Sequence, residues 1–264
     1  MKIGFIGCGN MGSAMISGIL KKGIYSCDEI IVSNLTEEGN RRSREKLKVV
    51  TTMDNCEVVR KAKLVFLAVK PQFYEEVLTQ VRNELTPEHT VVGIAPGKTI
   101  AWLEEKCGQL LKVVRMMPNT PAQVGEGMTA VCANEKVTQE DMKMICSITD
   151  SFGKTEIIPE GLMDAAGAVS GCSPAYVFMF IEAMADAAVA QGMPRKQAYR
   201  FAAQAVLGSA KMVLETGMHP GELKDMVCSP AGTTIEGVRI LEQRGLRSAV
   251  FEALNGAAEK GKSM

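Results

Sequence analysis

The sequence predicts an α/β protein with a doubly wound, mostly parallel sheet over residues 1–159 and an all-α domain over residues 160–264. Three observations predict this division. Short apolar runs alternate with segments of helical periodicity through the first half, as in βαβ folds. A glycine-rich turn joins the first of these runs to the first helical segment. After Pro159 the apolar runs stop, and alanine-rich segments of helical periodicity follow.

Composition argues against several classes of protein. Lys plus Arg and Asp plus Glu both number 30, so the net charge gives no argument for binding nucleic acid or an anionic membrane. The eight cysteines form no C-x-x-C pair, which indicates reduced thiols in a cytoplasmic protein. With two histidines and no metal-ligand spacing, we expect no metal site. Because the first apolar run starts at Ile3, we expect no cleaved signal.

The first apolar run, Ile3–Ile6, is one strand long and leads into Gly7, Gly9 and Gly12 at G-x-G-x-x-G spacing. Apolar residues then recur at helical spacing as far as Leu20. In this context the first glycine permits the tight turn, the second lets a pyrophosphate approach, and the third allows close helix packing. The helix N-terminus attracts phosphates. We favour a Rossmann-type dinucleotide site over the alternative of a glycine turn without a ligand.

Later apolar runs predict the other strands of the sheet. Leu64–Val69 is continuously apolar, as expected for a parallel strand covered on both faces. The remaining expected strands are Ile30–Val32, Val49–Val50, Thr90–Ile94, Leu111–Val114, Met128–Ala133 and Thr155–Ile158.

Helices are expected between these strands. Asp54–Asn55 reads as a cap for a helix that runs to Lys61. Pro71 suits the first position of the next helix. A later helix is expected from about Thr138 to Ser151. Asn119–Pro121 is expected to be a loop, because proline disfavours helical backbone in the residue before it.

The end of the second strand bears on the choice of dinucleotide. NAD enzymes carry an acidic residue about 20 residues past the glycine turn, but Ser33 and Asn34 stand here. Their neutral side chains do not repel a 2′-phosphate and can donate hydrogen bonds to it, which favours NADP over NAD. The alternative, compatible with the first, is that they cap the helix starting near Thr36. Lys70 follows another strand and is equally readable as a ligand contact or an exposed lysine.

The segment Pro174–Gln191 predicts a helix that is apolar on all sides, with Glu182 and Asp186 as its only charges. Ser173 is expected to cap it. Such a helix must be buried, but two acids in its middle make a membrane span costly. An all-α domain of this size has little room to surround it fully. We therefore expect it to lie in a homodimer interface.

Further helices are expected over Pro194–Glu215, over Glu222–Cys228 and from Ser248 to about Lys260. Between the last two, Ser229 reads as an N-cap and Pro230 as the first residue of another helix. The N–H groups of the next residues lack intrahelical partners, and Gly232 keeps the approach to them open. A small carboxylate would fit this site. The alternative is an ordinary capped helix.

Five motifs, in this order, resemble those of the pyrroline-5-carboxylate reductases. They are the glycine turn, Ala68–Pro71, Met117–Pro121, Ser170–Tyr176, and Leu223–Asp225 running into Ser229–Thr234. The resemblance covers essentially the whole chain, and its last two motifs are the specific ones. It implies an NAD(P)H-dependent oxidoreductase that transfers a hydride to the C=N bond of 1-pyrroline-5-carboxylate, giving L-proline in the last step of proline biosynthesis.

The resemblance also implies roles for individual residues. Thr234 would be the catalytic hydroxyl near the imine nitrogen, either as proton donor or as a group that positions a water. Substrate would be bound by Ser170, Ser229, Gly232, Thr233 and Thr234. NADP, or NAD in its place, would be bound by Gly7, Cys8, Gly9, Asn10, Met11, Gly12, Ser33, Asn34, Asn55, Ala68, Val69, Lys70, Pro71, Ala95 and Gly97, with Ala95–Gly97 beside the nicotinamide. Family members form intertwined homodimers, some of which assemble into decamers.

The chain departs from the common family pattern at four positions. Cys172 puts a thiol where serine is usual, and Gly167 replaces a threonine. Pro96 removes one N–H near the nicotinamide, and Leu35 replaces the arginine that would meet a 2′-phosphate. Two other functions stay open at this point: a reductase of a different imine or 2-keto acid, and a dinucleotide sensor without turnover.

Overall fold

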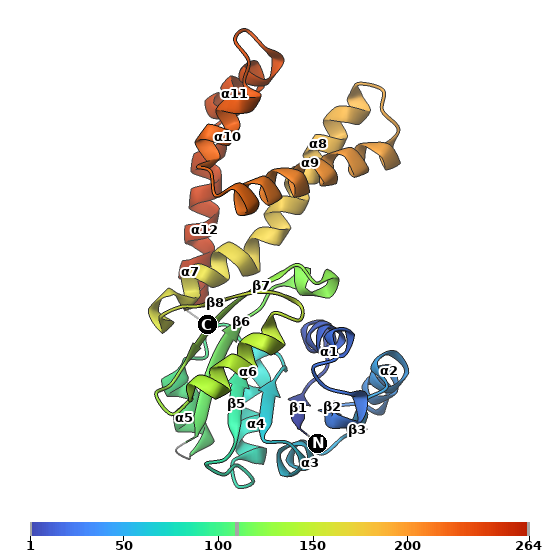
Figure 1. Ribbon diagram of the computed structural model, residues 1–264, viewed down its shortest axis with the longest axis vertical. Coiled ribbons are helices and arrows are strands. Elements are labelled where there is room, and N and C mark those ends of the chain that lie inside the picture. Colours follow the sequence, from blue (N-terminus) through green and yellow to red (C-terminus); the bar gives the residue numbers. More distant parts are fainter. Residues whose placement is uncertain (1, 109–110, 263–264) are drawn as a thin grey trace. The chain divides into compact units, whose positions relative to one another are not determined.

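The computed structural model of the protein describes residues 2–108 and 111–262 (Figure 1). The chain forms two compact units, one of Met1–Gly171 with Ala257–Met264 and the other of Cys172–Gly256. The sheet lies in the first unit and ends at Ile157. The functional division expected at residue 159 stays a prediction.

The first unit contains an eight-stranded sheet in the order β3-β2-β1-β4-β5-β6-β7-β8. Every neighbouring pair is parallel except β6 and β7. The doubly wound, mostly parallel sheet is therefore confirmed, with strand ends shifted by at most three residues. The strands are β1 Ile3–Ile6, β2 Ile30–Ser33, β3 Val50–Thr52, β4 Leu64–Leu67, β5 Thr90–Gly93, β6 Lys112–Met117, β7 Gly127–Ala133 and β8 Gly153–Ile157.

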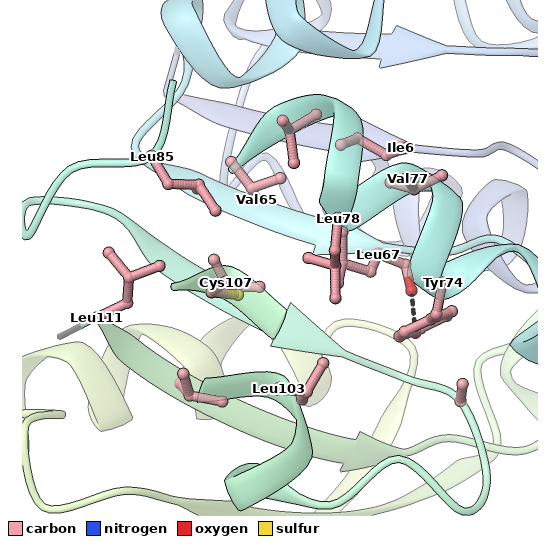
Figure 2. Packing of buried hydrophobic residues seen from close by; sticks show 14 of the residues in the cluster. Ile6, Val65, Leu67, Tyr74, Val77, Leu78, Leu85, Leu103, Cys107 and Leu111 are labelled. Carbon is pink, nitrogen blue, oxygen red and sulfur yellow. Dashed lines mark hydrogen bonds between the residues drawn. The ribbon is translucent and has the colours of Figure 1, made fainter. Parts of the chain in front are cut away.

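Helices cover both faces of this sheet because successive strand residues point to opposite sides. Phe5 and Phe66 stack at 4.8 Å between ring centroids in the core beneath α1 (Asn10–Lys22), α2 (Glu37–Leu47) and α6 (Gln139–Thr149). Ile6 and Leu67 point to the other core, under α3 (Asn55–Lys61), α4 (Tyr74–Val81) and α5 (Ile100–Cys107), which Figure 2 shows.

Two short 3₁₀ segments differ from expectation. Pro71–Phe73 forms one before α4, so the expected helix begins as a tighter turn. Thr120–Val124 forms another, and the expected loop at Asn119–Pro121 is wrong. A proline in the first turn of a helix loses an N–H that has no partner there, so it does not prevent such a turn.

The second unit consists of helices whose apolar side chains are largely exposed in the single chain. Phe178 in α8 is 64 % exposed, and Phe201 in α9 is 67 % exposed. The helices are α8 Ser173–Ala190, α9 Arg195–Thr216, α10 Pro220–Val227, α11 Thr233–Gln243 and the start of α12, Leu246–Lys262. In the described part of the chain, Glu160–Ala190 is the one helical segment that could cross a membrane by length and composition alone. One chain by itself therefore leaves apolar side chains of α8 exposed.

Candidate functional site: a glycine turn and an open helix end

The glycine turn at the end of β1 has the geometry of a phosphate cradle. Gly7 has φ +94°, and a Cβ there would lie 2.8 Å from the Ala68 carbonyl oxygen, so only glycine fits. At Gly12 a Cβ would lie 3.0 Å from the Gly7 carbonyl oxygen. These contacts bring the start of α1 close to the ends of β1 and β4, which is the switch point of the sheet.

Gly9 provides the opening in this cradle. It precedes α1 as the N-cap, and no side chain caps the helix there. A Cβ at Gly9 would meet nothing within 4 Å, and both Gly9 and Asn10 are exposed. The first N–H groups of α1 thus face open space and carry the positive end of the helix dipole. A pyrophosphate fits this opening.

Asn34 fastens the turn to the next strand and helix. Its Oδ1 accepts a hydrogen bond from the Cys8 N–H at 3.2 Å. Its Nδ2 donates to Asn40 Oδ1 and to Ser43 Oγ, both at 3.1 Å. Because both amide protons are used, Asn34 orders the turn and offers no free donor for a phosphate. Sequence reasoning missed this clamp.

The end of β2 shows which residue caps α2. Thr36, not Ser33 or Asn34, is the N-cap, and its hydroxyl accepts from the Gly39 N–H at 3.1 Å. The capping alternative for Ser33 and Asn34 is therefore wrong. Ser33 is buried, and its hydroxyl donates to Asn55 Oδ1 at 2.7 Å. Leu35 is 85 % exposed beside this site.

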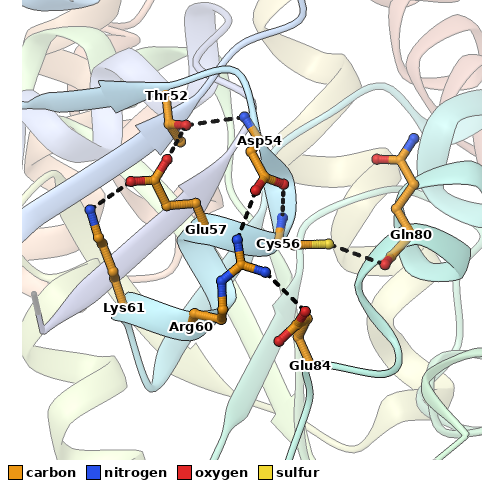
Figure 3. Close-up of polar contacts among 8 residues, drawn as sticks. All are labelled: Thr52, Asp54, Cys56, Glu57, Arg60, Lys61, Gln80 and Glu84. Atoms are coloured by element: carbon orange, nitrogen blue, oxygen red, sulfur yellow. Dashed lines mark hydrogen bonds and ion pairs between the residues drawn. The ribbon is translucent and has the colours of Figure 1, made fainter.

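A network of polar side chains surrounds α3 at the surface (Figure 3). Asp54 caps α3 as expected, by accepting from the Cys56 N–H at 2.8 Å. Arg60 joins Asp54 to Glu84 at 2.8 and 2.9 Å. Asn55 also donates to Gln80 of α4 at 2.8 Å. These bonds fix Asn55 beside Ser33 at the carboxyl end of β2.

The other residues expected at the cofactor follow β4 and β5. The Ala68 N–H donates to the Ile6 carbonyl at 2.8 Å, which places Ala68 directly beside the glycine turn. Lys70 is exposed at the start of the 3₁₀ segment. Ala95 is buried, and Gly97 has φ +72°. The structure thus brings the expected cofactor residues of the first unit to the carboxyl edge of one sheet.

In the second unit, the helix end expected to bind a carboxylate begins later than expected. Its N-cap is Gly232, not Ser229, and α11 starts at Thr233. The Gly232 N–H donates to the Ser229 carbonyl at 3.0 Å, and Ala231 has φ +55°, so Pro230 lies in a turn before the helix. A β-turn accepts proline at its second position, which explains why the cap signal misled.

This turn leaves a set of unused donors at the start of α11. The Gly232 N–H is taken, and no side chain caps the helix. The N–H groups of the first three helical residues, Thr233 to Ile235, lack intrahelical partners by the geometry of a helix end. A Cβ at Gly232 would lie 2.3 Å from Ser229 Oγ, so a larger residue would have to displace the serine hydroxyl. Thr233 and Thr234 are exposed, and the end can receive a small carboxylate.

Ser170 lies in a π-helical turn, Gly167–Cys172, and its polar groups are held from two sides. Its hydroxyl donates to the Ala166 carbonyl at 2.8 Å, and its carbonyl accepts from Asn119 Nδ2 at 2.9 Å. Asn119 Oδ1 also accepts from the Met128 N–H at 2.8 Å. Asn119 therefore anchors the turn. Its place in a Pro-rich motif predicts only that it lies in a loop, so the sequence did not reveal this role. π-Turns are frequent at functional sites.

The start of α8 differs from expectation. Helical backbone continues from the π-turn through Cys172, which is αR, into Ser173. Ser173 is consequently a helical residue and not the N-cap. The cap signal of a Ser-Pro pair was overridden because the chain enters α8 already helical.

Arg115 on β6 is a buried cation that the sequence did not reveal. It pairs with Glu160 at 3.3 Å and with Asp164 at 3.2 Å, the latter in α7 (Met163–Ala166). Glu160 also accepts from the Ile100 N–H at 2.7 Å, at the start of α5. This group of charges ties the first helical turns after the sheet to β6 and α5.

Comparison with known proteins gives consistent matches along the chain. A family model described as pyrroline-5-carboxylate reductase dimerisation matches residues 160–264, and one described as NADP oxidoreductase, coenzyme F420-dependent, matches residues 2–97. The chain is 49 % identical to pyrroline-5-carboxylate reductase of Escherichia coli over 263 residues, covering 100 % of this chain and 98 % of that protein. It is 46 % identical to the Methanosarcina acetivorans enzyme, covering 100 % and 97 %.

A solved structure agrees. The chain superimposes on Plasmodium falciparum pyrroline carboxylate reductase with NADP bound at a TM-score of 0.91 and 34 % identity. The match covers 100 % of this chain and 97 % of that one.

Proposed function

This chain belongs to the pyrroline-5-carboxylate reductase family, and we infer that it reduces 1-pyrroline-5-carboxylate to L-proline with NADPH, in the last step of proline biosynthesis. The observation that carries this inference is the full-length identity of 49 %, which spans both the glycine turn and the helix end of α11. When bound, NADPH supplies the hydride that the carbon of the C=N bond accepts.

We propose that the glycine turn holds the pyrophosphate of the cofactor. Support comes from the open space at Gly9 and from the uncapped N-terminus of α1. Cys8, Asn10 and Met11 contribute backbone around it. Ser33, Asn34 and Asn55 form the adenosine side of the crevice, while Ala68–Pro71 and Ala95–Gly97 form the nicotinamide side. Since Asn34 uses both amide protons within the protein, its contribution is to hold the turn.

We propose that the start of α11 binds the substrate carboxylate. The N–H groups of Thr233 and Thr234 donate to it, while Gly232 and Ser229 shape the turn. The Thr234 hydroxyl lies on the same helix end and donates a hydrogen bond toward the imine nitrogen. The proton that this nitrogen takes up, as the carbon takes up the hydride, comes from this hydroxyl or from a water that it positions. Such a site needs orientation and anion binding rather than a strong acid. We also propose Ser170 as a substrate-binding residue, and Asn119 fixes the turn that carries it.

The protein forms a homodimer through its C-terminal helices. We propose that exposed apolar side chains of α8 and α9 are buried in that interface. We further propose that the dimers assemble into a decamer. The protein would act in the cytoplasm without a nucleic-acid or membrane partner. Light scattering at micromolar concentration tests the assembly. A monomeric mass would contradict the dimer, and a dimeric mass would contradict the decamer.

The activity is tested by the loss of reduced-nicotinamide absorbance with pyrroline-5-carboxylate, run in parallel with NADPH and NADH. We expect rapid oxidation and a preference for NADPH. Binding of NADPH without oxidation by this substrate would mean that Cys172, Gly167 and Pro96 accompany a different substrate.

A further inference from the structure

Tyr74 is a fully buried tyrosine at the point where β4 and β5 end. Its side chain has no exposed surface, and Figure 2 shows its hydroxyl pointing at the end of β4. The hydroxyl donates to the Leu67 carbonyl at 2.5 Å and accepts from the Ile94 N–H at 2.9 Å. One oxygen atom therefore bridges the last residue of β4 and the first residue after β5.

This bridge replaces a bond of the parallel ladder. The register pairs Leu64 with Thr90 and Leu67 with Gly93, and the Thr90 N–H donates to the Lys63 carbonyl at 2.8 Å. In a parallel pair this donor–acceptor relation recurs every second residue on both strands. Four residues further along, the Ile94 N–H should therefore meet the Leu67 carbonyl directly. The Tyr74 hydroxyl lies between them instead.

The inserted hydroxyl separates the two strand ends without leaving either backbone group unsatisfied. A direct N–H···O bond spans about 2.9 Å, whereas here two consecutive bonds of 2.9 and 2.5 Å join donor to acceptor. From these ends the chain continues into Ala68–Pro71 and into Ala95–Gly97. The wider spacing of the two strand ends at Tyr74 therefore also sets the spacing of the two loops where they begin.

We propose that Tyr74 is a positioning residue that sets the width of the nicotinamide side of the crevice by holding these two loops apart. This inference rests on the proposed function, which gives both loops to the cofactor. Tyr74 touches neither the cofactor nor the substrate in this scheme; it acts through Leu67 and Ile94.

Two further observations support a fixed hydroxyl. Burial raises the pKa of Tyr74, so the hydroxyl keeps its proton and its donor role throughout the neutral range. The centroids of the Tyr74 and Trp102 rings lie 6.4 Å apart, and Lys98 Nζ lies 4.7 Å from the centroid of the Trp102 ring. Lys98 directly follows Gly97, so the second loop is linked to the tyrosine through its side chains as well.

The test is Tyr74→Phe, which keeps the ring and removes the bridging oxygen. Calorimetry without substrate compares the affinities for NADPH and for 2′,5′-ADP, a fragment that lacks the nicotinamide half. We expect NADPH to bind about tenfold more weakly, as for loss of one well-made hydrogen bond, and 2′,5′-ADP to bind unchanged. The matched control is Thr149→Val, which removes a buried hydroxyl that donates to the Ile145 carbonyl at 3.0 Å within α6. Its ligand affinities should not change.

Several outcomes would overturn the inference. Unchanged NADPH affinity in Tyr74→Phe would do so, and so would an equal loss for both ligands, which would indicate general damage. Hydrogen exchange in the wild-type chain gives an independent readout, since an unprotected Ile94 amide would exclude the bridge. Wild-type protein that fails to bind NADPH would overturn the proposed function itself, whereas failure of the variant alone would overturn only the role of Tyr74.

Discussion

The side-chain oxygen of Asn34 accepts a hydrogen bond from the backbone N–H of Cys8, 3.2 Å away. The bond joins the glycine turn after β1 to the end of β2. The amide group of the same side chain is held by α2. The shape of the turn therefore depends on a residue 26 positions further along the chain.

Asn34→Ala should weaken both the fold and cofactor binding. It removes three hydrogen bonds, and each contributes about 0.5–1.5 kcal/mol to stability. Asn134 is a matched control, because its side chain accepts from the Val113 N–H and donates to the Leu111 carbonyl at the opposite edge of the sheet. We expect both alanine variants to lower Tm, and only Asn34→Ala to raise the Kd of NADPH in a fluorescence titration. Equal affinities in the two variants would contradict the clamp.

Gly9→Val should abolish tight NADPH binding and leave the fold intact. A Cβ at Gly9 meets nothing within 4 Å and its φ is −72°, so the free energy of unfolding should change by less than about 0.5 kcal/mol. The branched side chain then occupies the space proposed for the pyrophosphate. Undiminished NADPH affinity would remove the glycine turn from the binding site.

Gly7→Ala, unlike Gly9→Val, should destabilise the fold. Its φ of +94° and the 2.8 Å approach to the Ala68 carbonyl make any side chain strained, at a cost of about 1–3 kcal/mol. Thermal unfolding of the protein without ligand measures this loss. A wild-type Tm would show that the turn adapts.

Leu35→Arg should sharpen the preference for NADPH. Leu35 is 85 % exposed and directly follows Ser33 and Asn34, which we propose for the adenosine side of the cofactor, so arginine can extend toward a 2′-phosphate without disturbing the core. We expect the KM for NADPH to fall several-fold, consistent with roughly 1 kcal/mol for an exposed ion pair, and the KM for NADH to stay constant. Leu35→Gln is the neutral control. A similar fall with glutamine would exclude the charge as the cause.

Thr234→Ala should lower kcat by one to two orders of magnitude, since one hydrogen bond made in the transition state contributes about 1–3 kcal/mol. Thr234→Ser keeps the hydroxyl and should retain most of the rate. Steady-state kinetics with pyrroline-5-carboxylate separates kcat from KM. A wild-type kcat for the alanine variant would remove this hydroxyl from the mechanism.

Tyr74 should also contribute to the loss of folding stability at alkaline pH. Burial raises its pKa in the folded state, so above the ordinary tyrosine pKa of about 10 the unfolded chain loses this proton first. The folded state binds more protons there, and stability falls as pH rises. We expect the decline in Tm above about pH 10 to be shallower in Tyr74→Phe than in the exposed control Tyr199→Phe. Identical slopes would contradict the prediction.

The sequence by itself determined the order of strands and helices, the glycine turn, and the family motifs. These depend on local properties. Ile3–Ile6 is apolar, and only glycine tolerates the left-handed φ of position 7. Asp54 and Thr138 cap the helices that follow them. Such features act within one or two turns of chain, so a pattern of neighbours is enough to predict them.

The tertiary structure alone decided which polar groups hold the site together. Asn34 and Cys8, Tyr74 and Ile94, and Arg115 and Glu160 are 20 to 45 residues apart in the chain. Parallel strands whose crossovers return to the same edge of the sheet bring the first two pairs together, whereas Arg115 and Glu160 meet through β7 and β8, which run antiparallel to β6. The wrong caps at Ser173 and Ser229 have a related cause: the chain entered α8 already helical, and a left-handed Ala231 turned it before α11. A local signal sets a helix end only where the rest of the fold leaves the backbone free to follow it.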